Sequence, residues 1–149
     1  MKISPRHRGF TLIEVLLVVV IIAILSGIVI IAVNPARQIA QTNNAQRDSD
    51  VRALLDAVHQ YSIDNRGVLP TAITTTATVV GSGGTQVDIC SLLVPTYVSA
   101  MPFDPTSATA SYTDCTTYDT GYTIATDVNG RVTVAAPNAE LAATVSVTR

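Results

Sequence analysis

The chain has 149 residues, of which 48% are hydrophobic and only 13% are charged, and its formal net charge is −2. This length suits one modest domain plus an extended element, and so few charges favour a membrane-inserted segment over a uniformly soluble globule. Lysine is absent after Lys2, so the rest of the chain is acidic and argues against a general nucleic-acid-binding surface.

Residues 1–9 form a short basic head. It contains Lys2, Arg6 and Arg8 without any acid, and it ends at Gly9. Because basic flanks of membrane segments remain in the cytoplasm, we expect this head to stay inside while the following segment inserts.

Residues 10–33 form an apolar run of 24 residues with one charge, Glu14. As a helix the run would be about 36 Å long, enough to cross a bilayer core about 30 Å thick. Secretory signal peptides have a shorter apolar region followed by a small-residue cleavage site. Here the small residue, Gly9, stands before the run, so the sequence predicts a retained anchor with a removable head.

A second helical pattern follows the anchor. Proline has no N–H and clashes with the preceding turn, so we expect a kink or local opening at Pro35. Apolar residues then recur on one helix face: Val51, Leu54, Leu55, Val58 and Tyr61. The turn-forming residues 65–67 end the pattern. The sequence predicts one long helix over about residues 10–65, apolar in its first half and amphipathic in its second.

Residues 68–149 are rich in Thr, Val, Ala, Gly and Ser, a composition that favours strands and loops. The alternation in residues 121–136 predicts a hairpin with a two-residue type I′ turn at Asn129-Gly130. Residues 74–80 and 143–147 are further strand candidates. The apolar stripe of the helix and the apolar face of the sheet must both be buried, so we predict that they pack on each other.

The expected fold class is therefore α+β, with a long N-terminal helix packed against a small antiparallel β-sheet head. The expected domain organisation has four parts. They are a cleaved leader at 1–9, an apolar anchor at 10–33, an amphipathic helix at 34–67 and a β-rich head at 68–149.

The two cysteines, Cys90 and Cys115, both follow the anchor. If the anchor inserts with its basic end inside, both lie in an oxidising compartment, where disulfides persist. A bridge between them would contribute roughly 3–4 kcal/mol in the chain-entropy model. The alternative is a pair of unrelated buried thiols.

The candidates for metal binding and catalysis are few. Asp127 and Asn129 alternate as in the first half of a calcium loop, but no acid follows within nine residues of Gly130. The hairpin turn is the simpler interpretation, so we expect no cofactor. His59 is the one histidine after the head and has no second ligand nearby, so we expect a solvent-facing or head-packed residue. With no nucleophile–base pair or metal cluster, the sequence does not predict an enzyme.

The segment RGFTLIEVLLVVVIIAILSGIVI resembles the N-terminus of the type IV pilin and pseudopilin superfamily. The likeness consists of a basic leader ending in Gly9, then Phe10 and Glu14 at fixed offsets before the apolar helix. Weaker similarity continues at the segments NRGVLPT and LVPTYVSAMPFDP. The resemblance implies that a membrane-embedded prepilin peptidase cuts between Gly9 and Phe10 and N-methylates Phe10. It also implies that an inner-membrane platform assembles the subunits into a helical homo-oligomeric filament.

The resemblance also suggests a role for Glu14. In a filament, its carboxylate could pair with the free amine that cleavage creates on Phe10 of a neighbour, because neither charge fits apolar surroundings alone. The alternative is an interfacial carboxylate that extends towards water near the helix end.

We expect a structural subunit of a bacterial type IV pilus, with a major-type pseudopilin of a type II secretion system as the alternative. A minor tip pilin that binds DNA is disfavoured by the acidic body. The expected disulfide and the missing acid-rich calcium loop favour the pilus. The expected location is the cytoplasmic membrane, as a single-pass protein with its head outside, and then the extracellular pilus or a periplasmic pseudopilus.

Overall fold

The computed structural model describes residues 9–149, so the predicted leader lies outside the described residues except for Gly9. The chain divides into two compact units, Met1–Gln38 and Ile39–Arg149, which are described one at a time. The anchor predicted at 10–33 falls within the first unit.

Helix α1, Leu12–Val33, is the main element of the first unit. Thr11 is its N-cap, and the Thr11 hydroxyl accepts the backbone N–H of Glu14 at 3.3 Å. The 22 residues of α1 span about 33 Å. By length and composition α1 is apolar enough to cross a membrane.

The helical region is interrupted at Asn34, where the backbone is left-handed with φ 45°. Asn34 ends α1, and its side-chain oxygen accepts the N–H of Arg37 at 3.3 Å. Helix α2, Pro35–Asp64, then begins at the proline, whose fixed φ suits the first position of a helix. The opening expected at Pro35 is therefore present as a one-residue interruption, and the segment predicted as one long helix over residues 10–65 consists of two helices. The proline starts a second helix, and the residue before it makes the break.

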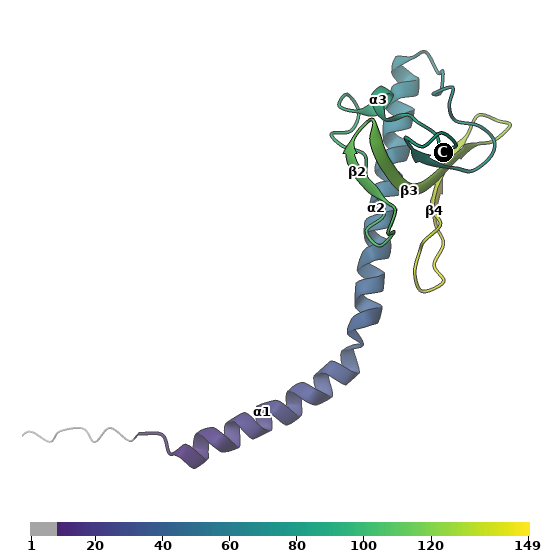
Figure 1. Cartoon of the computed structure of the whole chain (residues 1–149). Helices are drawn as coiled ribbons and strands as arrows, with labels where there is room; N and C mark the ends of the chain where they lie inside the picture. Colours follow the sequence, from purple (N-terminus) through teal and green to yellow (C-terminus); the bar gives the residue numbers. More distant parts are fainter. Residues whose placement is uncertain (1–8) are drawn as a thin grey trace, which may run out of the picture. The chain divides into compact units, whose positions relative to one another are not determined.

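The second unit is built on an antiparallel sheet (Figure 1). Its strands are β1 Thr78–Gly81, β2 Ser111–Asp114, β3 Thr117–Thr126, β4 Val132–Ala136 and β5 Val145–Thr148. The strand order is β1-β3-β4-β5, and β2 also pairs with β3. A short helix, α3 Cys90–Leu93, precedes β2. The strands predicted around 74–80 and 143–147 correspond to β1 and β5.

The core of this unit lies between α2 and the sheet. Four residues of the predicted helix stripe are fully buried: Val51, Leu54, Leu55 and Val58. They join the inward side chains of β3 and β4, which are Tyr122, Ile124, Val132 and Val134. The register pairs Ile124 with Val134, so one face of the hairpin is apolar. The α+β fold and the packing of stripe on sheet are confirmed.

The turn between β3 and β4 differs from the prediction. The N–H of Gly130 donates to the carbonyl of Asp127 at 3.1 Å, and Asp127 N–H donates to the carbonyl of Arg131 at 2.8 Å. Gly130 has φ 80°, whereas Asn129 is not among the described residues with positive φ. A type I′ turn needs positive φ at both central residues. The loop is therefore a turn over Asp127–Gly130 closed by a left-handed glycine.

Candidate functional site

The first candidate site is the segment that leads into α1. Gly9 and Phe10 precede the helix and are exposed, with 81% of Phe10 accessible. Glu14 lies in the first helical turn, where unpaired backbone N–H groups favour negative charge. The predicted cleavage position and the predicted assembly carboxylate therefore lie together at the start of α1.

The second feature is the surface of α1. Every residue of this helix is exposed, and its side chains are apolar on all sides apart from Glu14, Ser26 and Gly27. Soluble monomers rarely expose continuous apolar patches beyond a few hundred Å². A helix of this kind needs lipid or other apolar helices around it.

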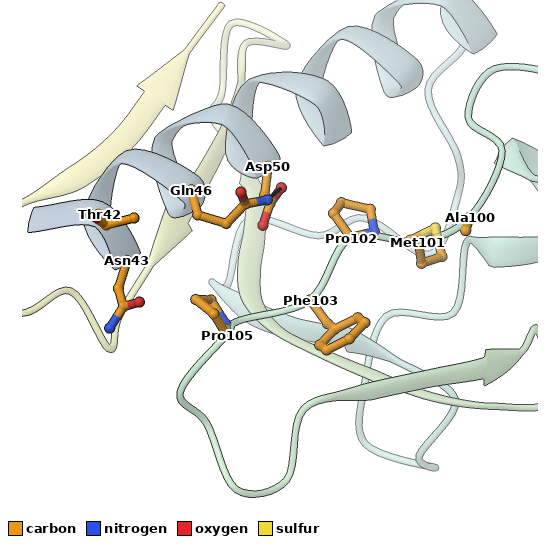
Figure 2. Close-up of a pocket in the computed structure, with 9 residues that line it drawn as sticks. All are labelled: Thr42, Asn43, Gln46, Asp50, Ala100, Met101, Pro102, Phe103 and Pro105. Atoms are coloured by element: carbon orange, nitrogen blue, oxygen red, sulfur yellow. Dashed lines mark hydrogen bonds between the residues drawn. The ribbon is translucent and has the colours of Figure 1, made fainter. Parts of the chain in front are cut away.

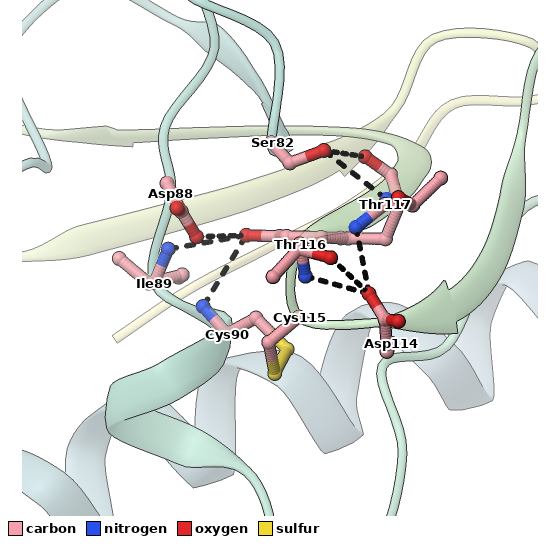
Figure 3. The surroundings of a disulfide bond; sticks show 9 residues. Ser82, Asp88, Ile89, Cys90, Asp114, Cys115, Thr116 and Thr117 are labelled. Atoms are coloured by element: carbon pink, nitrogen blue, oxygen red, sulfur yellow. Dashed lines mark hydrogen bonds between the residues drawn. A yellow bond between two sulfur atoms is a disulfide. The ribbon is translucent and has the colours of Figure 1, made fainter.

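The disulfide joins Cys90 at the start of α3 to Cys115 in the turn between β2 and β3, with 5.2 Å between the two Cα atoms (Figure 3). In the same turn, Asp114 Oδ1 accepts the backbone N–H groups of Thr116 and Thr117 at 2.8 and 2.9 Å. The bridge thus links two locally fixed segments.

Tyr118 supports the other side of the disulfide. Its buried hydroxyl accepts the N–H groups of Ile89 and Cys90, both at 3.2 Å, and donates to Asp88 at 2.8 Å. Burial and the Asp88 carboxylate raise the pKa of this phenol, so it remains a donor at all physiological pH values.

A buried arginine organises the start of α2 in the second unit. Arg47 donates from Nε and Nη2 to the two carboxylate oxygens of Asp104, at 2.8 and 3.1 Å. Its Nη1 donates to Glu140 at 3.0 Å and to Asn44 at 2.9 Å, and its Nη2 also donates to Thr106. All five N–H groups of the guanidinium therefore have an oxygen partner, which is the condition for burying this charge.

The loop between β4 and β5 is held on α2 by the same cluster. Asn44 donates to the carbonyl of Glu140 at 2.8 Å and accepts its N–H at 2.9 Å, while Asn43 donates to its carboxylate at 2.9 Å. The next two residues, Leu141 and Ala142, have φ of 58° and 53°, a conformation that costs energy in non-glycine residues. The polar contacts of Glu140 offset that cost.

The electrostatics of the cluster follow from its contacts. Burial opposes ionisation of Asp104, but hydrogen bonds from Arg47, Thr106 and Ser107 and the arginine charge outweigh it and lower the pKa of Asp104. Hydrogen bonds from Asn43 and Arg47 likewise lower the pKa of the Glu140 carboxyl. Both carboxylates are therefore ionised in the folded protein at neutral pH.

A groove lies beside this cluster, between α2 and the loop that follows Ser99 (Figure 2). Its volume is about 550 Å³. At its helix wall, Asp50 accepts the Tyr122 hydroxyl and the Gln46 amide, both at 2.8 Å. Burial raises the pKa of Asp50, against the lowering effect of the Tyr122 and Gln46 hydrogen bonds.

The residues proposed for calcium take part in the hairpin turn. The Asp127 carboxylate accepts the N–H groups of Asn129 and Arg131 and the Arg131 Nε, at 2.8 to 2.9 Å. Residues 9–149 contain no group of three or more His, Cys, Asp or Glu side chains that could hold a metal. His59 is half-buried on α2, and its Nε2 is buried without a hydrogen-bond partner.

Comparison with known proteins identifies the N-terminal segment. The family model described as the prokaryotic N-terminal methylation motif matches residues 4–30. The chain is also 35% identical, over 65 residues, to the type II secretion system core protein G of Escherichia coli (strain K12). These two matches support the assignment of the chain to the type IV pilin and pseudopilin superfamily.

The match to protein G covers 44% of this chain and 43% of the relative, so it spans less than half of that protein. No solved structure matches the chain.

The sequence predicts roles for Gly9, Phe10 and Glu14, which remain predictions, but the Arg47 cluster was missed. Arg47 lies four residues before Val51 and seven before Leu54, so it falls on the buried face of α2. An arginine at the helical spacing of an apolar stripe is the sequence feature that could have indicated a buried cation with several partners. Its partners could not be found this way, because they come from loops without a periodic pattern.

The Arg47 cluster generates a stability prediction. Arg47→Met leaves Asp104 buried without its cation, so the variant should lose about 3–5 kcal/mol of unfolding free energy. Urea unfolding of the detergent-solubilised full chain, followed by tyrosine fluorescence, measures this loss. The control is Arg52→Met, which removes an exposed, solvent-screened ion pair with Asp48 and should cost far less than Arg47→Met. Equal losses in the two variants would contradict the role of Arg47.

A second stability prediction concerns Asp50, whose negative charge is expected to destabilise the folded protein. Its raised pKa means that the folded state resists ionisation, so its contribution is present below the ordinary carboxyl pKa and is lost as pH rises through the folded pKa. Asp50→Asn keeps an acceptor for Tyr122 and a donor for the Gln46 carbonyl. The variant should therefore match or exceed the wild-type melting temperature at pH 7 and show a smaller decrease between pH 4 and 7.

The control for Asp50 is Asp48→Asn, a half-exposed carboxylate on the same helix. A clear drop in the melting temperature of Asp50→Asn at pH 7 would show that the folded protein needs the charge at this position.

Proposed function

We propose that the protein is the structural subunit of a helical filament whose copies associate through α1. The observation that carries the proposal is a 22-residue helix without a buried residue, most of which lies within the matched methylation motif. Before assembly, lipid would cover this helix in the cytoplasmic membrane, with the second unit outside. In the filament, helices of other copies would replace the lipid.

Processing would create the polar group that assembly uses. Prepilin peptidase would cut between Gly9 and Phe10 and methylate the new amine, which remains cationic. The Glu14 carboxylate would then pair with the Phe10 amine of a neighbouring copy. Since each charge is poorly solvated in an apolar core, the pair would fix the register of adjacent helices more than it adds stability.

Within this class we propose a type IV pilus as the destination. The Cys90–Cys115 bridge supports this choice, because a surface fibre works outside the cell, where a covalent link limits unfolding. The partners would be other copies of the chain, the peptidase and an inner-membrane assembly platform. The proposed role requires no cofactor and no nucleic acid.

The second candidate is a pseudopilus of a type II secretion system. The similarity to protein G favours it, because that relative is named as a core protein of such a system. Both candidates share the N-terminal chemistry and differ in where the filament ends.

The proposal is tested by imaging fibres on cells that express the chain. Immunogold labelling should mark long surface fibres in the wild type. Glu14→Val should lose at least about 90% of the fibres sheared from cells, since one charge of each pair is left alone. Cleavage after Gly9 should remain intact in this variant, as judged by gel mobility.

Two further variants control for shape and for general damage to α1. Glu14→Gln keeps the size of the side chain and should also fail, whereas Ile22→Val should assemble normally. Normal fibre yield from Glu14→Val would contradict the pairing. Absence of surface fibres, together with a secretion defect in cells without the protein, would favour the pseudopilus.

A further inference from the structure

The groove at the start of the second unit offers an unusual set of polar groups. Gln46 and Asn43 line it from α2 and use their amide nitrogens for Asp50 and Glu140. Among the described residues, their side-chain oxygens have no donor. The groove therefore presents hydrogen-bond acceptors beside a carboxylate.

The opposite wall of the groove is apolar. It consists of Pro102, Phe103 and Pro105, with 44% of Phe103 exposed (Figure 2). An aromatic face next to acceptor oxygens suits a cation with an apolar stem or apolar neighbours. An arginine that is flanked by aliphatic side chains has this chemistry.

One arginine of the second unit fits the description. Arg47, Arg52, Arg131 and Arg149 all form ion pairs with carboxylates. Arg66, just after the end of α2, is exposed and has no side-chain ion pair or hydrogen bond within residues 9–149. Its backbone is fixed with φ 61°.

Two exposed aliphatic residues accompany Arg66. Ile63 is 70% exposed and Val68 is 59% exposed. We call Ile63, Arg66 and Val68 the terminal patch, and it combines one unpaired cation with apolar surface. Its chemistry is complementary to that of the groove.

The two surfaces cannot meet within one copy. Gln46 and Asp64 lie on the same continuous helix, 18 residues apart, which is about 27 Å along its axis. A contact between different patches of two copies is heterologous, and a heterologous contact repeats into an open helical assembly unless its rotation closes a ring. The positions of the two surfaces thus suit a filament.

We propose that the terminal patch of one copy docks into the Gln46–Phe103 groove of another copy along the filament. This proposal rests on the proposed function and adds a contact between second units to the association of the α1 helices. Arg66 would donate to the Gln46 and Asn43 oxygens and lie over the ring of Phe103. Ile63 and Val68 would cover the proline wall.

The proposal is tested by crosslinking in fibres sheared from cells that express the full chain. Cys90 and Cys115 are bonded to each other, so introduced cysteines provide the free thiols. The double variant Ala100→Cys/Asn65→Cys keeps Gln46 and Arg66 and places thiols at the groove and beside the terminal patch. Treated with a short bis-maleimide, it should give a ladder of crosslinked copies on a denaturing gel. Either single variant should give no ladder. The pair Arg52→Cys/Asn65→Cys, with both changes outside the groove, is the matched control.

A charge reversal provides the second measurement. Arg66→Glu should lower the yield of sheared fibres about tenfold or more, because it places a carboxylate against the acceptors of the groove. Arg52→Glu, which reverses an exposed charge on the same helix, should leave the yield within about twofold.

The outcomes separate the two proposals. Normal fibres without the Ala100–Asn65 ladder, or with full yield from Arg66→Glu, overturn the docking contact and leave the proposed function intact. Absence of fibres from the wild-type chain overturns the proposed function and the docking contact with it.

Discussion

The uncovered apolar surface of helix α1 is the physical constraint on which the rest of the structure depends. A helix that is apolar all round and uncovered by its own chain cannot remain in water, so lipid or other apolar helices must surround it. In that setting Glu14 is costly unless it finds a cation. Removal of the leader would supply one, since the new amine at Phe10 would arise four residues before the carboxylate.

In the second unit, long loops must be held in place against a small sheet. Arg47 does this with a fully satisfied guanidinium that joins α2 to Asp104 and Glu140. The disulfide closes the segment that carries Asp104, so covalent and ionic links act on the same region of the fold. The groove next to it therefore has walls that are fixed on both sides.

The anchor, the α2 stripe and the β3–β4 hairpin could be predicted from the sequence, because each follows a strong periodicity or a local turn signal. The break at Asn34 and the turn at Gly130 were predicted less well, since both depend on which single residue takes a left-handed conformation. The partners of Arg47 and the groove were not predictable, because Asp104 and Glu140 lie in irregular loops that only the folded chain brings to α2. Glu14 stood out in the sequence as the lone charge of the apolar run.

The most direct test of the central claim is the mass of the N-terminal peptide from fibres purified after shearing. The account predicts a peptide that begins at Phe10 and carries one additional methyl group on its amine. Fibres whose subunits retain Met1, or begin at any residue other than Phe10, would contradict it, because Glu14 would then lack the cation that assembly requires.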